Sequence, residues 1–503
     1  MALPRVLLLN PPFAPRFSRT GARWQTRTKT DTLCWPSWLG YATGWLEKNG
    51  CEVVLIDAPA RNTGVHEIER FSESWSPDMV VLDTSTASLF NDISIAERLK
   101  VKLDVPVVLV GPHASALPEE TLMLSDKVDV VCKGEYDQTL VDLTKTFEGG
   151  ADLSRVPGIA YRSNGRIKRT QDRPLIKDLD SFPFVSSVYK RFLNPYDYFY
   201  GMCLYPMIQI FTSRGCPSRC VYCVWPQTMM GHEFRVRSVS NVVDELEYIA
   251  DELPMIKEII LEDDTFTYDK KRVSEFCDEI FHRDLHRTVF NEGGRYWTAN
   301  ARADIPLDLL RRMKRAGCRM LIVGFESGSQ EILNKAKKGI KVETARHFAK
   351  NAKKAGVQVM GCFMVGLPGE NRKTALETLK FANEIAPDFL FFNLASPLPG
   401  TEFYDYCKKN GFLKSTDFRD WVDEEGYLKP MLNYPDFSPE EMKKIVDTMA
   451  LRYVLQPQYV FRVLRHIAKD YREIYHYSRA IRHMMHYLRA TKSHQKRMDP
   501  PGD

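Results

Sequence analysis

The 503-residue sequence has no long apolar run. No stretch approaches the roughly 20 consecutive apolar residues that a membrane-spanning helix requires. The apolar run near the N-terminus, residues 6–9, is shorter than the hydrophobic region of a signal peptide. We therefore expect a cytoplasmic protein that is at most peripheral to a membrane.

The sequence also lacks the paired cysteine spacing of a secreted, disulfide-rich protein. Its eleven cysteines are an odd number and are scattered along the chain, which favours a reducing compartment. The net charge of +5 is small for this length and does not indicate a nucleic-acid partner. Apolar residues make up 44% of the chain, enough for the cores of two or three domains.

Short apolar runs alternate with helical patterns over residues 1–150. Five runs predict strands, at residues 6–10, 52–57, 78–83, 107–111 and 128–132. This α/β alternation is typical of a doubly wound, Rossmann-like sheet, which binds ligands at the carboxyl ends of its strands. No G-x-G-x-x-G follows the first strand, which argues against a dinucleotide. The residues at the expected ligand edge are Asn10, Thr84, Ser85, Thr86, Gly111, Pro112, His113, Gly134 and Glu135.

A second α/β domain is expected at residues 206–410, after a linker at 151–205 that contains a small hairpin near 157–167. Longer helical patterns separate its six predicted strands, which lie at 207–211, 256–261, 297–302, 319–324, 357–366 and 389–393. Six βα units predict an open, partial (β/α)6 TIM-like barrel, whose strand ends face one mouth. Residues 411–503 are expected to form a helical extension.

Three cysteines, Cys216, Cys220 and Cys223, follow the first strand of this barrel. Three thiolates on one tight loop can hold an iron–sulfur cluster and leave one iron open for a ligand. The alternatives are unligated thiols or a zinc site. Zinc in a structural site requires a fourth ligand, for which His232 is the nearest candidate.

The C-x3-C-x2-C spacing, with an aromatic residue before the last cysteine, resembles the signature of the radical S-adenosylmethionine (radical SAM) superfamily. The resemblance extends over residues 205–410 and implies a 4Fe–4S cluster that cleaves SAM. The acidic tip at 262–264 departs from the family pattern, because the usual Gly-Gly-Glu is Glu-Asp-Asp here. The positions that match SAM contacts are Tyr222, Glu262, Asp263, Arg302, Glu326, Ser327, Gly366 and Gly369.

The N-terminal sheet resembles the cobalamin-binding domain that precedes the radical SAM core in one subfamily. The likeness implies cobalamin at the ligand edge described above. The D-x-H-x-x-G motif, which supplies a cobalt-ligating histidine in other cobalamin proteins, is absent. We therefore expect His113 to be a loop or packing residue rather than a cobalt ligand. A vestigial sheet that binds nothing remains the alternative.

The C-terminal segment is basic. Residues 452–497 contain eleven lysines and arginines against two acids, interleaved with apolar side chains. Such an amphipathic segment can dock on the core of its own protein, lie on an anionic membrane or bind RNA. Docking is the favoured interpretation, and nucleic acid the least favoured.

The domain order resembles that of cobalamin-type radical SAM enzymes, among them the anaerobic Mg-protoporphyrin ester cyclase. Segments at 21–27, 35–39, 56–59 and 452–457 also resemble the hopanoid-biosynthesis radical SAM proteins. The resemblance implies modification of an unactivated carbon in a lipid-like or polycyclic intermediate, by methylation, rearrangement or ring formation. It also implies an electron donor such as flavodoxin or ferredoxin. Cys362 and Tyr296, near strand ends, are candidate catalytic residues.

Two other functions are less compatible with the sequence. A tRNA-modifying methylthiotransferase needs a second cluster, but Cys34, Cys51 and Cys132 are far apart in the sequence. A non-catalytic cobalamin-binding sensor would leave the three-cysteine loop without a purpose.

Overall fold

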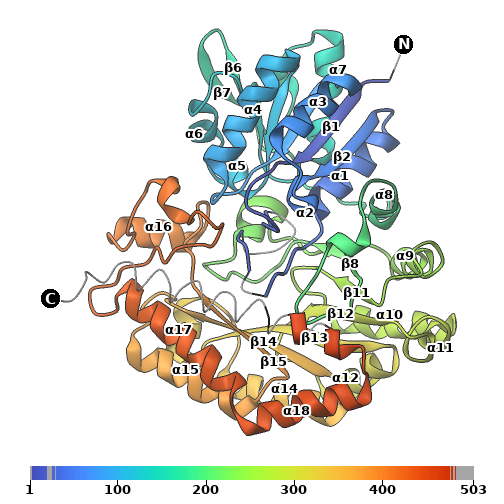
Figure 1. Ribbon diagram of the computed structural model, residues 1–503, viewed down its shortest axis with the longest axis vertical. Helices are drawn as coiled ribbons and strands as arrows, with labels where there is room; N and C mark the ends of the chain where they lie inside the picture. The colour runs from blue at the N-terminus through green and yellow to red at the C-terminus, as the bar shows by residue number, and fades with distance from the viewer. Residues whose placement is uncertain (1–2, 20–24, 29, 476, 480–481, 483–503) are drawn as a thin grey trace.

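The computed structural model describes residues 3–19, 25–28, 30–475, 477–479 and 482. Its N-terminal unit is built on a seven-stranded sheet in the order β2-β1-β3-β4-β5-β6-β7 (Figure 1). The strands are β1 (Arg5–Asn10), β2 (Glu52–Asp57), β3 (Met79–Asp83), β4 (Val107–Val110), β5 (Val130–Cys132), β6 (Ile159–Ser163) and β7 (Arg166–Arg169). Strands β1 to β5 are parallel, which confirms the doubly wound fold.

The hairpin expected inside the linker belongs to this sheet. Strand β6 pairs antiparallel with β5, and β7 pairs with β6. The sheet therefore extends to Arg169, beyond position 150. Sequence patterns show that a hairpin forms, but they do not show which strand edge it joins.

Alternate side chains of the buried strands pack on opposite faces of the sheet. Val6 and Leu8 enter a core shared with α1 (Ser37–Lys48) and α7 (Asp137–Gly149). Leu7 and Leu9 enter a second core, formed with α3 (Val65–Trp75) and α4 (Leu89–Leu103). Burial on both faces explains why the strands are continuous apolar runs.

The second unit is a six-stranded parallel sheet in the order β15-β14-β13-β12-β11-β8. Strands β8 and β15 form its two edges, so the barrel is open, as predicted. The strands are β8 (Met207–Ile210), β11 (Glu258–Leu261), β12 (Tyr296–Ala301), β13 (Cys318–Glu326), β14 (Gln358–Val365) and β15 (Phe389–Leu394). The main connecting helices are α9 (Val239–Glu252), α10 (Lys270–His282), α12 (Leu307–Arg315), α14 (Val342–Ala355) and α15 (Arg372–Ile385).

The C-terminal extension contains α16 (Glu402–Lys409), α17 (Pro439–Val454) and α18 (Pro457–Lys469). Helices α17 and α18 run along the barrel unit, on the side away from the N-terminal sheet (Figure 1). The Tyr453 hydroxyl donates to the Pro387 carbonyl, and Glu473 pairs with Arg319 at 3.3 Å inside the protein. The described part of the basic segment thus docks on the core. Residues 483–503 lie outside the described residues.

None of the helices in the described ranges is both long enough and apolar enough to cross a membrane.

Candidate active site

The three cysteines lie on a loop that a short ladder closes. Strand β9 (Ser213–Arg214) pairs antiparallel with β10 (Arg235–Val236). Gly215 has a φ of +87°, and a Cβ there would lie 2.0 Å from the Glu233 carbonyl oxygen. Only glycine fits such a position, so the loop geometry depends on it.

Polar side chains hold the backbone of this cysteine loop. The Gln227 amide donates to the carbonyl oxygens of Cys220 and Cys223, at 3.2 and 2.8 Å. The His232 Nδ1 lies 2.9 Å from the Cys216 carbonyl oxygen, within hydrogen-bond distance. His232 thereby supports the loop through this nitrogen. Burial, and then the nearby Asp264, raise the pKa of the Cys216 thiol.

The cysteine arrangement fits a cluster better than a single metal ion. No three Cys, His or acidic side chains in the described part of the chain are grouped so as to hold one ion. Cys216, Cys220 and Cys223 all line one cavity. In a 4Fe–4S cluster each thiolate binds its own iron, whereas zinc gathers its ligands around one centre. The donor set therefore fits the iron–sulfur cluster that the spacing predicted.

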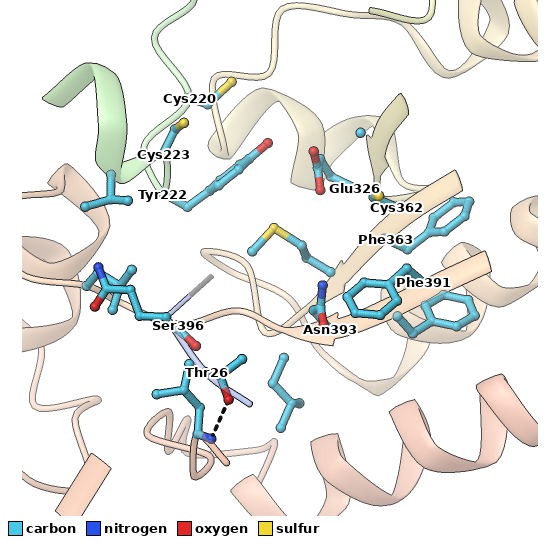
Figure 2. Close-up of a pocket in the computed structure, with 18 of the residues that line it drawn as sticks. Thr26, Cys220, Tyr222, Cys223, Glu326, Cys362, Phe363, Phe391, Asn393 and Ser396 are labelled. Carbon is cyan, nitrogen blue, oxygen red and sulfur yellow. Dashed lines mark hydrogen bonds between the residues drawn. The ribbon is translucent and has the colours of Figure 1, made fainter. Parts of the chain in front are cut away.

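The cavity has a volume of about 380 Å³ and lies at the barrel mouth. Figure 2 shows Cys220, Tyr222 and Cys223 along one side and Phe363 and Phe391 along the strands. Two distant segments, residues 25–28 and 427–430, complete the wall. The site therefore combines the barrel, the cysteine loop and both terminal regions.

Three of the predicted SAM contacts, Tyr222, Arg302 and Glu326, line this cavity. Glu326 pairs at 2.7 Å with Lys338, whose ammonium also lies 3.4 Å from the Tyr222 hydroxyl. The Arg302 guanidinium donates to the Ser218 hydroxyl at 2.7 Å. Glu326 follows a register shift in β13 and has a φ of 65°, a left-handed conformation that is uncommon for a non-glycine residue. These groups form a polar end of the cavity beside the cysteines.

The acidic tip differs from the prediction. Asp263 does not line the cavity, because its carboxylate accepts hydrogen bonds from the backbone and hydroxyl groups of Thr212 and Ser213. Glu262 accepts a hydrogen bond from Gln209 at 3.1 Å and is likewise outside the lining. The third acid, Asp264, lines the cavity instead. The first two acids anchor the strand that carries the cysteine loop.

Ser327, Gly366 and Gly369 also lie outside the lining of this cavity. The Ser327 hydroxyl is 3.0 Å from that of Thr378. Gly366 and Gly369 have φ values of 100° and 74°, so they serve backbone turns. The predicted direct contacts from these three residues are not supported by their positions.

Of the two catalytic candidates, Cys362 lines the cavity and Tyr296 does not. Tyr296 is the first residue of β12, at the end of the strand opposite the mouth, and lies 5.7 Å below the Arg472 guanidinium. The structure thus places Tyr296 away from the cavity, and its catalytic role stays an untested prediction. Its place near a strand boundary was visible in the sequence, but the relevant end is the carboxyl end.

The ligand edge of the N-terminal sheet faces the barrel unit (Figure 1). The Thr86 N–H donates to the Gln25 side-chain oxygen at 2.9 Å, and Gln25 lines the cavity. His113 packs edge-on against Phe418, and its Nδ1 lies 3.0 Å from the Thr86 hydroxyl. Burial lowers the pKa of His113 to about 3, so the imidazole is neutral. The edge of the sheet and the barrel mouth are thus joined through Gln25.

Part of this edge fits a cobalamin and part of it is already engaged. The Thr84 hydroxyl is buried and has no hydrogen-bond partner within the described ranges, so it can bind an amide of the corrin side chains. A Cβ at Gly111 would lie 2.5 Å from the Thr84 carbonyl oxygen, so any residue larger than glycine would clash with the backbone there. In contrast, Asn10 bonds Asp57 and Arg19.

The remaining edge residues serve the fold. The Glu135 carboxylate is buried and accepts two hydrogen bonds from Arg235, at 2.9 and 2.6 Å. Ser85 bonds Ser88, and the Gly134 N–H donates to Ser115. Pro112 begins the short helix α5 (Pro112–Ala116) and is buried. Glu135 was predicted as a ligand contact, but the structure engages it with the cysteine loop.

Sequence reasoning missed several residues that line the cavity. Asn393 is a polar residue within the otherwise apolar strand Phe389–Leu394, and this pattern could have predicted that it lines the cavity. Lys338 follows helix α13 (Gln330–Lys335) and carries no such signal. Ser396 and Asn300 are further polar residues of the lining that were not predicted.

An open parallel barrel with three thiols at its mouth, facing the ligand edge of a doubly wound sheet, defines an α/β enzyme with two cofactor-binding units. The sequence matches the Radical SAM superfamily over residues 210–382 and the B12 binding domain over residues 27–144. The chain belongs to the radical SAM superfamily, in the group that carries a B12 binding domain. Its cofactors are a 4Fe–4S cluster, SAM and cobalamin.

Relatives cover most of the chain. An uncharacterized methyltransferase of Pyrococcus horikoshii, PH0819, is 30% identical over 82% of this chain and 86% of its own length. The anaerobic magnesium-protoporphyrin IX monomethyl ester cyclase of Rubrivivax gelatinosus is 27% identical over 80% of this chain and 69% of its own. The hopanoid C-3 methylase of Methylococcus capsulatus is 22% identical over 79% of this chain and 73% of its own.

A solved structure shares the whole architecture. The radical SAM methyltransferase TsrM from Kitasatospora setae, determined with cobalamin and a [4Fe–4S] cluster bound, has a TM-score of 0.67. The match covers 91% of this chain and 90% of TsrM, at 18% identity. At that identity the likeness shows the fold.

Proposed function

We propose that this radical SAM enzyme uses cobalamin to methylate an unactivated carbon of a largely apolar small molecule, such as a lipid-like or polycyclic biosynthetic intermediate. The observation that carries the proposal is an apolar shelf inside the cavity. Its members are Ile322, Phe363, Met364, Phe391, Phe392, Leu394 and Leu398.

The shelf is organised by the pairing of two strands. In the register of β14 and β15, Cys362 is opposite Phe391, and Phe363 is opposite Phe392. Successive strand residues point to opposite faces, so the rings of Phe363 and Phe392 support the shelf from behind. There Phe363 packs on Phe325 and Phe381, and the ring beside Cys362 is that of Phe391. Aromatic side chains each offer about 150–250 Å² of surface, so this wall favours a flat or hydrocarbon body over a polar one. A substrate on the shelf would lie beside Cys362.

The 4Fe–4S cluster with SAM supplies hydrogen-atom abstraction, and cobalamin supplies a transferable methyl group. Within this chain, Cys216, Cys220 and Cys223 hold the cluster. Glu326 and Lys338 orient the polar groups of SAM, because they line the cavity next to Tyr222. The apolar shelf excludes water and aligns the substrate carbon.

A second candidate reaction is ring formation or rearrangement, which the similarity to the Mg-protoporphyrin cyclase favours. Both reactions require reduction of the cluster by a donor such as flavodoxin or ferredoxin. A lipid-like substrate also favours association of the enzyme with a membrane surface. Exposed apolar side chains on α18, such as Phe461 and Leu464, are the feature that supports such contact.

The test is anaerobic reconstitution with iron, sulfide and cobalamin, followed by ultraviolet–visible spectroscopy and product analysis. We expect both chromophores, and 5′-deoxyadenosine from SAM after reduction. Methylation also yields S-adenosylhomocysteine, whereas rearrangement does not. Reductive SAM cleavage by a Cys216→Ala variant would refute the enzyme assignment. Failure of the wild-type protein to retain cobalamin would refute the methyl-transfer part.

The shelf is tested with a Phe391→Ala variant and polycyclic triterpenoid and porphyrin substrates. If the shelf binds the substrate, KM rises at least tenfold while cluster content stays constant. An unchanged KM for every substrate that the wild-type enzyme accepts would contradict the role of the shelf.

A further inference from the structure

The cavity is covered by two segments that lie some 400 residues apart in the sequence. The Arg27 N–H donates to the Gly426 carbonyl at 2.9 Å, and the Leu428 N–H donates to the Thr26 hydroxyl at 3.1 Å. Figure 2 shows Thr26 at the end of the cavity opposite the cysteines, with one of these bonds drawn. We call residues 25–28 with 426–430 the joint cover. All of its residues except Gly426 line the cavity.

The joint cover brings positive charge to the cavity. Arg27 and Lys429 both line it, and neither forms an ion pair with a carboxylate within the described ranges, although the charge of Lys429 reaches Asp423. The Arg27 guanidinium lies 5.5 Å from the centre of the Tyr427 ring, and the residue is half-buried. A third cation, Lys443, is paired with Asp447 at 2.7 Å. Among these residues Arg27 therefore has no acidic partner, and Lys429 has only the unpaired Coulombic contact with Asp423.

The acids at the other end of the cavity do not compensate these charges. Glu326 is engaged with Lys338, and Asp264 lies beside the cysteine loop. A half-buried arginine on an aromatic face is suited to charge-assisted hydrogen bonds with phosphate or carboxylate groups. Between the cover and the cysteines lies the apolar shelf.

We propose that the joint cover is a subsite for an anionic group, so that the substrate is an amphiphile with an apolar body and a phosphate or carboxylate. This inference rests on the proposed function, because it assigns the apolar body to the shelf. Arg27 and Lys429 bind the anion and set the position of the body along the shelf. The cover thereby selects for substrates that carry such a group.

The probe is n-octyl phosphate, compared with n-octanol, n-octyltrimethylammonium and inorganic phosphate. Binding to the reconstituted enzyme with SAM present is measured by anaerobic calorimetry at low salt. We expect n-octyl phosphate to bind at least tenfold more tightly than each of the other three. Equal binding of n-octanol would overturn the anionic subsite, and equal binding of inorganic phosphate would overturn the link to the shelf.

Variants separate the subsite from general effects of charge. The Arg27→Gln/Lys429→Gln double variant should lose the preference for n-octyl phosphate, whereas Arg27→Lys should keep most of it. Lys414→Gln is the matched control, because Lys414 is exposed, belongs to the same extension and does not line the cavity. Iron content and thermal unfolding verify that each variant folds.

Two outcomes distinguish the inference from the proposed function. If the double variant loses affinity for SAM but keeps the preference for n-octyl phosphate, the cover serves SAM and the inference is wrong. If wild-type protein binds n-octyl phosphate selectively but does not cleave SAM, the proposed function fails and the subsite stands.

Discussion

Glu135 joins the N-terminal sheet to the cysteine loop, and its removal is the sharpest test of how the two units are held together. Its carboxylate is 2% exposed and accepts two hydrogen bonds from the equally buried Arg235. Arg235 also donates to the Met230 and Ile176 carbonyls, at 2.8 and 2.6 Å. A Glu135→Gln variant leaves a buried guanidinium without its counter-charge.

Removing one partner of a buried ion pair costs about 3–5 kcal/mol. The glutamine oxygen still accepts one hydrogen bond, so we expect the free energy of unfolding to fall by about 3 kcal/mol. This corresponds to about a hundredfold change in the unfolding equilibrium constant. The assay is urea unfolding of the reconstituted protein. Glu233→Gln is the control, since Glu233 lies in the same segment as Arg235 and its ion pair with Lys177 of the linker is exposed. We expect that control to unfold near the wild-type midpoint.

The reasoning fails if Glu135→Gln unfolds at the midpoint of the Glu233→Gln control. A variant of normal stability that no longer retains cobalamin would show instead that Glu135 contacts the cofactor. That outcome would restore the sequence-based prediction for this residue.

Three further predictions concern other parts of the molecule. Cys362→Ala should lower the ratio of product to 5′-deoxyadenosine at least tenfold, whereas Tyr296→Phe, at the far end of its strand, should leave that ratio unchanged. Burial raises the pKa of Glu370 to about 8, from an ordinary 4.5, so the native state binds a proton that the unfolded state releases between these values. Wild-type stability should therefore fall relative to Glu370→Gln as pH rises from 4.5 to 8, and parallel urea midpoints across this range would contradict it. Glu473→Ala should lower the free energy of unfolding by about 1.5–3 kcal/mol, because Arg319 loses a charged hydrogen bond. The variant should also make α18 more sensitive to limited proteolysis. Cleavage at the wild-type rate would show that this contact does not anchor the segment.

The strands of both sheets were predictable because parallel strands are buried on both faces and appear as continuous apolar runs. The cysteine loop was predictable because its ligands are close together in sequence. Partners from distant segments were not. Asp263 is engaged by Thr212 and Ser213, some 50 residues earlier, so the acid that reaches the cavity is the next one, Asp264.

The same limit applies to the cobalamin edge and the tail. Strand ends give the location of Asn10 and Glu135, but Arg19 and Arg235 decide that these side chains turn inward. The composition of the basic segment allowed docking, membrane contact or RNA binding. Its docking depends on single contacts, such as Glu473 with Arg319, that no periodicity shows.

The joint cover sets an order on the biosynthesis of the active enzyme. Thr26 and Leu428 are 402 residues apart, so the cover cannot form until the second segment has been synthesised. At about 5–20 residues per second, the N-terminal segment waits roughly 20–80 s for its partner. The barrel strands and the three cysteines are synthesised within that interval, so the cover cannot shield the cysteines before residues 426–430 have been added. Insertion of the cluster would therefore come before the cover closes the cavity.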